Sequence, residues 1–203
     1  MIRIRNISHQ ADLLKVSYGM EHLPQQNRVH IHAGDVAVSN TPVVLETLLG
    51  SCVAVCLYDP TLCAGGMNHI LLPGSTLDAK STRFGVNAME LLINELMKHG
   101  GERRRFIAKA FGGANVMHSV SKSAIGDENA LFVCNFLETE KIPLIAQRLG
   151  GTQPVRLNFR TDTGKATVHT VDGSQLHKLI HAEEAYRRAH VVDRDYSGEI
   201  TLF

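Results

Sequence analysis

The sequence predicts an α/β protein of the α+β type, a single layered sandwich domain in which mixed β-sheets carry flanking helices. Short alternating or continuously apolar runs recur between Gly, Pro and Asn residues, as in β-strands, and two longer segments repeat apolar residues at helical spacing. Tight turns join several of the expected strands. Hairpins are therefore too frequent for a purely parallel, doubly wound sheet.

The expected strands are spread over the middle of the chain. Three strands are expected in succession after residue 28: VHIHAG, VAVS and VVLETLL. The next strand, SCVAVCLYD, is expected to form a hairpin with MNHILL through the turn PTLCAGG. This hairpin places His69 opposite the strand that begins at Cys52. FIAKAF, IPLIAQ, PVRLNF and KATVHTV supply the later strands, and a hairpin turn over residues 161–164 joins the last two.

Two helices are expected between these strands. The first, over residues 82–98, ends at a Gly-Gly pair, which is typical of a helix stop. Its predicted apolar positions are Val86, Met89, Ile93 and Met97. The second, GDENALFVCNFLETE, has acidic residues in its first turn. Its predicted apolar positions are Leu131, Cys134, Phe136 and Leu137.

The length of 203 residues fits one domain with terminal additions. Residues 1–28 are polar and interrupted by PQQN, so we expect a loosely attached N-terminal extension. Residues 29–172 contain most of the predicted strands and both helices. Residues 173–203 are expected to form a C-terminal helical extension, with a helix over residues 174–190.

Charge and cysteine usage exclude several classes of protein. The chain has 21 basic and 20 acidic residues, so bulk charge predicts no nucleic-acid partner. No run approaches the roughly 20 apolar residues of a membrane span, and the first ten residues lack the apolar block of a secretory signal. We therefore expect a cytoplasmic protein without membrane insertion. The four cysteines form no CxxC motif and are expected to be thiols.

The triplet Gly50-Ser51-Cys52 stands where an apolar strand begins. A glycine and a serine before the cysteine allow a sharp backbone turn, at which amide groups could converge on a developing oxyanion. His69 could lower the pKa of the thiol from about 8.5 and make it nucleophilic. On this pattern alone, core packing is the commoner explanation of a cysteine, and it is the one we adopt for Cys56.

Several motifs resemble one known family when they are taken in order. The chain resembles the chemoreceptor glutamine deamidases of the CheD family in five segments: LLGSCVAVCLYDP, GGMNHILLPG, AKAFGGANVM, IGDENALFV and LGG. The resemblance covers roughly residues 29–172 and implies a cysteine amidohydrolase domain there. It implies hydrolysis of the side-chain amide of particular glutamines on methyl-accepting chemotaxis receptors, which gives glutamate.

The same resemblance assigns roles to residues of this chain. It implies that Cys52 is the nucleophile and His69 the catalytic histidine. The family has a threonine six residues before the cysteine, where this chain has Glu46 followed by Thr47. These two neighbours face opposite sides of a strand, so only one can orient the histidine. We take Thr47 as that group and keep Glu46 as the charged alternative.

Gly50 and Ser51 are predicted to bind substrate beside the nucleophile. Gly112, Gly113 and Asn115 match the FGGAN segment of the family. Two interpretations of this segment remain open, a wall of the substrate cleft and a tight turn that leaves a buried strand.

The chemistry implied by the resemblance needs no metal or organic cofactor. The implied partners are the cytoplasmic domain of chemotaxis receptors and a CheC-type phosphatase of the response regulator CheY, and a monomer is expected. Two alternatives remain open: a regulatory adaptor with weak or no catalysis, and receptor methyl-ester hydrolysis at the same thiol. A zinc site is a weaker alternative because the candidate ligands lack the usual pair spacing. Those ligands are Cys52, Cys56, Cys63 and His69.

Overall fold

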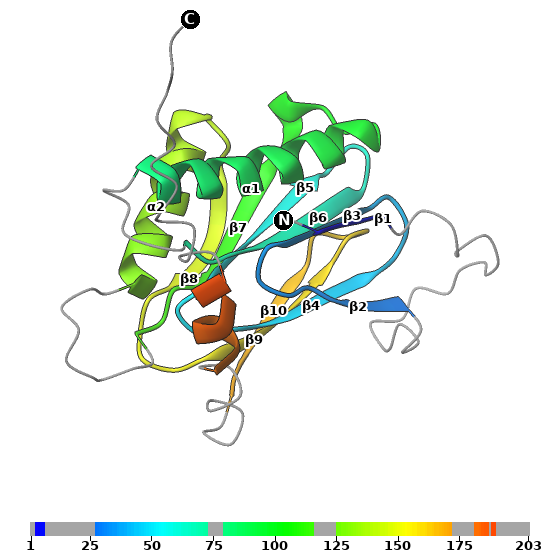
Figure 1. Ribbon diagram of the computed structural model, residues 1–203. Coiled ribbons are helices and arrows are strands. Elements are labelled where there is room, and N and C mark those ends of the chain that lie inside the picture. Colours follow the sequence, from blue (N-terminus) through cyan, green and yellow to red (C-terminus); the bar gives the residue numbers. More distant parts are fainter. Residues whose placement is uncertain are drawn as a thin grey trace, which may run out of the picture.

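The protein has three layers: two helices, a six-stranded sheet and a four-stranded sheet (Figure 1). The computed structural model describes residues 3–6, 27–72, 79–115, 125–171, 181–186 and 188–189. Both helices cover one face of the larger sheet, and the smaller sheet packs on its other face (Figure 1). The predicted class, a layered domain of mixed sheets with flanking helices, is confirmed.

The six-stranded sheet has the order β1-β3-β6-β5-β7-β8. Its strands are β1 (Arg3–Asn6), β3 (Asp35–Ser39), β5 (Val53–Asp59), β6 (Ala64–Ile70), β7 (Ile107–Gly112) and β8 (Leu144–Leu149). The two outer pairs, β1 with β3 and β7 with β8, are parallel, and the inner pairs are antiparallel. Strand β1 lies in the segment expected to be loosely attached, so the N-terminal extension contributes an edge strand to the larger sheet.

The four-stranded sheet has the order β10-β9-β4-β2. Its strands are β2 (Arg28–His30), β4 (Val44–Leu49), β9 (Val155–Arg160) and β10 (Ala166–Thr170). The β9–β10 hairpin turns at residues 161–164, as predicted. Strand β4 is central: it pairs antiparallel with β9 and parallel with β2.

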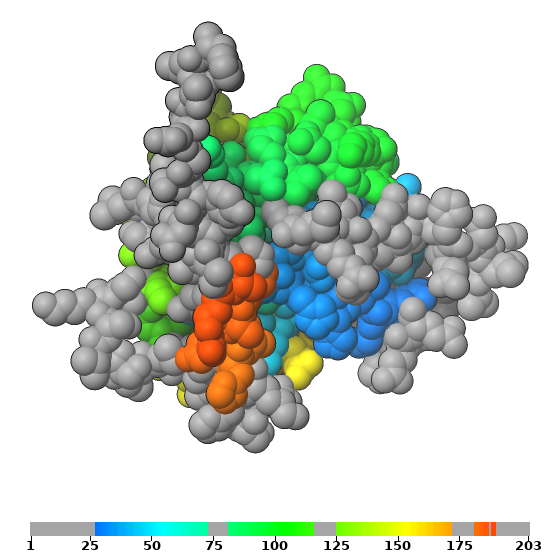
Figure 2. Space-filling view, viewed as in Figure 1, coloured from blue at the N-terminus to red at the C-terminus, as the bar shows by residue number. Residues whose placement is uncertain are grey.

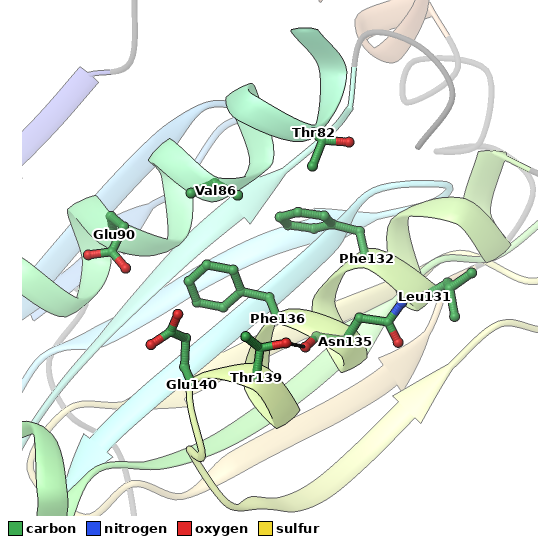
Figure 3. A pocket seen from close by; sticks show the side chains of 9 residues that line it. All are labelled: Thr82, Val86, Glu90, Leu131, Phe132, Asn135, Phe136, Thr139 and Glu140. Carbon is green, nitrogen blue, oxygen red and sulfur yellow. Dashed lines mark hydrogen bonds between the residues drawn. The ribbon is translucent and has the colours of Figure 1, made fainter. Parts of the chain in front are cut away.

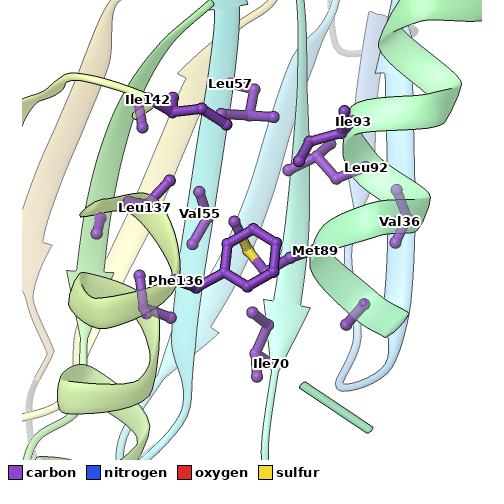
Figure 4. Close-up of a cluster of buried hydrophobic side chains, with 14 of the residues drawn as sticks. Val36, Val55, Leu57, Ile70, Met89, Leu92, Ile93, Phe136, Leu137 and Ile142 are labelled. Carbon is purple, nitrogen blue, oxygen red and sulfur yellow. The ribbon is translucent and has the colours of Figure 1, made fainter. Parts of the chain in front are cut away.

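Helices α1 (Ala79–Lys98) and α2 (Ile125–Thr139) bury apolar stripes against the larger sheet. A 3₁₀ turn, η2 (Arg103–Arg105), links α1 to β7. Figure 4 shows the cluster between the helices and the sheet, with Met89 and Phe136 reaching toward Val55.

The predicted helix faces need a correction at three positions. Val86, Met97 and Leu131 are 38%, 44% and 55% exposed, although all three were assigned to apolar faces. Val86 and Met97 lie at the margin of the α1 stripe, which centres on Leu92 and Leu96. Helical periodicity identified the stripe but not its borders. On α2, Cys134 is half-buried.

A second core fills the space between the two sheets. Alternation along β5 directs Val53, Val55 and Leu57 toward the helices. Cys52 and Cys56 point the other way, into the inter-sheet core. Cys56 is buried there, and burial raises the pKa of its thiol. This environment agrees with the packing role assigned to Cys56.

Candidate active site

Cys52 lies in a three-residue crossover between the two sheets. Strand β4 of the smaller sheet ends at Leu49, and strand β5 of the larger sheet begins at Val53. Gly50, Ser51 and Cys52 make the connection, and the Cys52 side chain is fully buried. The unusual triplet of the sequence is therefore the point at which the chain changes layers.

The end of strand β7 holds this crossover from one side. The amide of Gly113 donates to the carbonyl of Cys52 at 2.7 Å, and the amide of Ala114 donates to the carbonyl of Gly50 at 2.7 Å. Gly112 has φ +107°, and a Cβ atom there would lie 2.2 Å from the Cys52 carbonyl oxygen. Only glycine fits this position without moving the backbone of Cys52.

Asn129 of helix α2 holds the crossover from the other side. Its Nδ2 donates to the carbonyl of Ser51 at 2.8 Å, and its Oδ1 accepts from the amide of Leu72 at 3.0 Å. This buried amide therefore ties the crossover to the chain just beyond β6. Sequence reasoning did not identify Asn129, although it lies in the IGDENALFV motif.

The FGGAN segment contacts the backbone around Cys52. Gly112 and Gly113 pack against the crossover as described, and the side chain of Asn115 donates to Asp127 at 3.0 Å. The three residues do not belong to the lining of the cavity that contains Cys52. Their substrate-binding role stays a prediction, while their described contacts are those of a tight turn.

Thr47 and His69 are joined by a hydrogen bond across the two sheets. Thr47 points inward from β4, and its Oγ1 lies 2.9 Å from Nδ1 of His69 on β6. The same hydroxyl donates to the carbonyl of Ile31 at 2.7 Å. Because a hydroxyl has one hydrogen, Thr47 must accept from His69, which places the ring proton on Nδ1.

Glu46 faces the other side of β4. Its carboxylate accepts from Arg28 at 3.3 Å and lies 2.9 Å from Nε2 of His30. Of the two candidates for orienting the histidine, Thr47 is therefore the one that contacts His69.

The environment of His69 favours its neutral form. Burial lowers the pKa of His69, while the Ile31 carbonyl and the negative charge of Glu183 act in the opposite direction. With the proton on Nδ1, Nε2 carries a lone pair. This buried nitrogen has no hydrogen-bond partner among the described residues. It is therefore available to accept a proton.

Glu183 was not expected at this site. It belongs to a short helical segment, residues 181–186, and is 95% buried, with 5% of its surface exposed. Its Oε2 accepts from Ser51 Oγ at 2.5 Å, and its Oε1 accepts from the Cys52 thiol at 3.1 Å. These contacts span about 130 positions of sequence. No local pattern indicates them.

A cavity of about 410 Å³ joins these groups. Cys52, His69 and Thr47 line it together, and Glu183 and Tyr186 border it from the C-terminal helical segment. His30, His32 and Arg156 also contribute to its wall. The cavity thus combines a thiol, a base and hydrogen-bond donors, which are the parts needed for nucleophilic attack on an acyl group.

A second cavity, of about 470 Å³, lies between helices α1 and α2 (Figure 3). Phe132 and Phe136 line it, and its two carboxylates, Glu90 and Glu140, both pair with Arg103. Among the described residues, its lining includes no cysteine, histidine or lysine. Of these two cavities, the first is the one that brings a nucleophile and a base together.

Neither a metal site nor a membrane helix is found in the part of the chain that the structure describes. Within those ranges, no three His, Cys, Asp or Glu side chains converge as metal ligands would. None of the helices there has the length and apolar character needed to cross a membrane.

Comparison with known proteins gives a consistent result. The family described as "CheD chemotactic sensory transduction" matches residues 71–170. A protein of Agrobacterium fabrum, "Probable chemoreceptor glutamine deamidase CheD", is 45% identical over 77% of this chain and 87% of its own. A protein of the same name from Stenotrophomonas maltophilia is 42% identical over 82% of this chain and 84% of its own. "Probable chemoreceptor glutamine deamidase CheD 1" of Shewanella oneidensis is 39% identical over 88% of this chain and 89% of its own.

Proposed function

The chain belongs to the CheD family, and we propose that it is a chemoreceptor glutamine deamidase in which Cys52 is the nucleophile and His69 the acid–base group. The observation that carries the proposal is the arrangement around His69. Thr47 fixes the tautomer of His69, and the buried Nε2 of His69 has no partner among the described residues. His69 and Cys52 line the same cavity.

The reaction proceeds through two acyl transfers. His69 Nε2 accepts the thiol proton, and Cys52 Sγ attacks the carbonyl carbon of the glutamine side chain. The C–N bond then breaks, and ammonia leaves with a proton from His69. Water, deprotonated by His69, hydrolyses the thioester and releases the glutamate side chain and the free thiol.

Two groups of the crossover stabilise the oxyanion. The amide of Cys52 donates to Oε1 of Glu183, and the hydroxyl of Ser51 donates to Oε2 of the same carboxylate, which supports this assignment. A donor of this kind contributes about 3 to 4 kcal/mol to transition-state stabilisation. The hydrogen bonds to the carbonyls of the crossover keep the amide of Cys52 in place before substrate arrives.

The proposed partners rest on this activity and on the resemblance to the CheD family. The substrate is the cytoplasmic domain of methyl-accepting chemotaxis receptors, so the enzyme acts in the cytoplasm. A CheC-type phosphatase is a further partner, and the enzyme itself acts as a monomer. The chemistry draws on side chains and water alone.

The test uses a purified receptor cytoplasmic domain and peptide mass spectrometry. The wild type is expected to convert specific glutamines to glutamate, and Cys52→Ala to convert none. Cys56→Ala is the matched control, because Cys56 is a buried thiol on β5, four residues beyond Cys52 and outside the cavity, and it should remain active. Equal conversion by wild type and Cys52→Ala would contradict the proposal. Loss of receptor methyl esters without loss of glutamine would indicate the ester hydrolase instead.

A further inference from the structure

The C-terminal helical segment, residues 181–186 and 188–189, lies over the candidate active site. In Figure 2 its orange and red atoms lie directly against blue atoms of the N-terminal part of the domain. Tyr186 anchors it: its ring meets the ring of Phe84 on α1 edge to face, with centroids 6.3 Å apart. A Cβ atom on Gly34 would lie 2.7 Å from the Tyr186 hydroxyl, so this loop packs closely on the segment.

From this position, Glu183 places its carboxylate on the groups that we assign to catalysis. Oε1 accepts hydrogen bonds from the thiol of Cys52, at 3.1 Å, and from the amide of Cys52, at 3.4 Å. Oε2 accepts a hydrogen bond from the hydroxyl of Ser51, at 2.5 Å. Three donors of one crossover thus converge on a single side chain.

The position of the Glu183 carboxylate at the Cys52 thiol resembles that of the product in an enzyme–product complex. Deamidation of a glutamine leaves a glutamate side chain above a free thiol, and here a glutamate side chain lies above the thiol of Cys52. We propose that Glu183 occupies the subsite for the side chain of the substrate glutamine, so that the segment carrying it competes with the receptor for the site. This inference rests on the proposed function.

A catalytic role for Glu183 is the main alternative. In a cysteine–histidine pair, a carboxylate assists by bonding to the histidine nitrogen that does not face the thiol. That nitrogen, Nδ1 of His69, is bonded to Thr47. Glu183 instead bonds to the nucleophile and to Ser51, where the substrate must bind.

The first experiment converts the segment into a substrate. In Glu183→Gln, a carboxamide replaces the carboxylate, and Cys52 should hydrolyse it to glutamate with release of ammonia. The control is Glu184→Gln, because Glu184 pairs with Arg188 and does not line the cavity.

Mass spectrometry of the C-terminal peptide reads the outcome. It should find glutamate restored at position 183 in the first variant, and the introduced glutamine retained at position 184 in the second. When Cys52→Ala is combined with Glu183→Gln, the introduced glutamine should be retained at position 183 as well.

The second experiment measures competition. Glu183→Ala removes the hydrogen bonds that hold the competing side chain, so deamidation of a receptor cytoplasmic domain should be about tenfold faster than with Glu184→Ala. A slower reaction than with Glu184→Ala would show that Glu183 assists catalysis, and an equal rate would show that it does not compete. Either result overturns the inference. Retention of the glutamine of Glu183→Gln in an enzyme that deamidates the receptor also overturns it, while the proposed function stands.

A third readout needs no receptor. Alkylation of Cys52 by iodoacetamide should be faster in Glu183→Ala than in Glu184→Ala, because the side chain that covers the thiol is gone. Equal rates would overturn the inference. Failure of the wild type to convert any receptor glutamine would overturn the proposed function, and the product-like interpretation with it.

Discussion

At the scale of single residues, we expect Thr47 to act on the reaction through its hydrogen bond to His69. Thr47→Val removes the acceptor of the Nδ1 proton and leaves the ring free to turn or change tautomer. We expect kcat to fall about ten- to hundredfold with little change in KM, since a hydrogen bond of this kind contributes roughly 1 to 3 kcal/mol. The measurement is steady-state deamidation of a receptor fragment.

Thr47→Ser keeps the hydroxyl and should recover most of the activity. Glu46→Gln is the neighbouring control, because Glu46 faces Arg28 and His30 and should leave kcat within about twofold of the wild type. If Thr47→Val and Thr47→Ser were equally impaired, packing rather than the hydrogen bond would explain the position.

His69 should also make the protein sensitive to acid. Burial lowers its pKa in the folded state, so below about pH 6.5 the unfolded chain binds a proton that the folded chain does not. Stability is then lost as the pH falls, by up to about 1.4 kcal/mol per pH unit, until the lowered pKa is reached.

Urea unfolding at several pH values between 7 and 5 measures this effect. His69→Gln cannot titrate, so its free energy of unfolding should fall less steeply than that of the wild type. Parallel slopes for the two proteins would show that His69 is not the group responsible.

At the scale of elements, hydrogen bonds from two neighbouring parts of the fold hold the crossover between β4 and β5. Gly113 and Ala114, just after β7, donate to the carbonyls of Cys52 and Gly50. Helix α2 binds the carbonyl of Ser51 through Asn129. All three carbonyls of the crossover are thereby fixed from outside it. The amide of Cys52 can then point into the cavity without rearrangement when charge develops there.

Gly112→Ala tests this support. The added Cβ would meet the Cys52 carbonyl at 2.2 Å, so the backbone must shift. Gly151→Ala is the matched control, because Gly151 also has a positive φ, +84°, but its Cβ would enter open space. We expect Gly112→Ala to destabilise the protein by at least about 2 kcal/mol more than Gly151→Ala, and to reduce deamidation. Similar stability and activity of the two variants would contradict the role given to this turn.

At the scale of the whole molecule, the candidate site belongs to two sheets at once. Thr47 comes from the smaller sheet, His69 from the larger sheet, and Cys52 from the link between them. Its geometry therefore depends on how the sheets pack on each other. The layer formed by the helices and the far face of the larger sheet contributes stability but none of these side chains.

Two large-to-small substitutions separate these contributions. Phe159→Ala opens a cavity in the inter-sheet core, and Leu96→Ala opens one beneath the helices. Both should cost about 2 to 5 kcal/mol of stability. Only Phe159→Ala should also lower kcat when activity is measured per folded molecule. Equal loss of kcat in both variants would argue against a site positioned by inter-sheet packing.

Local sequence patterns predicted the geometry of part of the site, while the catalytic roles expected for Cys52 and His69 came from the resemblance to the CheD family. The strand that follows Cys52 and the strand that carries His69 form a hairpin with a tight turn. Such a hairpin can be predicted from two apolar runs and the turn residues between them. The choice between Glu46 and Thr47 needed the second sheet, because alternation says that two neighbours face opposite ways but not which face is buried. Glu183 depends on contacts across about 130 residues, which no periodicity encodes.

Hydroxylamine tests whether Cys52 carries the glutamyl group as a thioester, as proposed above. A thioester on Cys52 would react with hydroxylamine as well as with water, so receptor glutamines should appear partly as hydroxamates and partly as glutamates by mass spectrometry. Cys52→Ala should yield neither product. Conversion by the wild type to glutamate alone, at hydroxylamine concentrations that cleave a model thioester rapidly, would contradict the account.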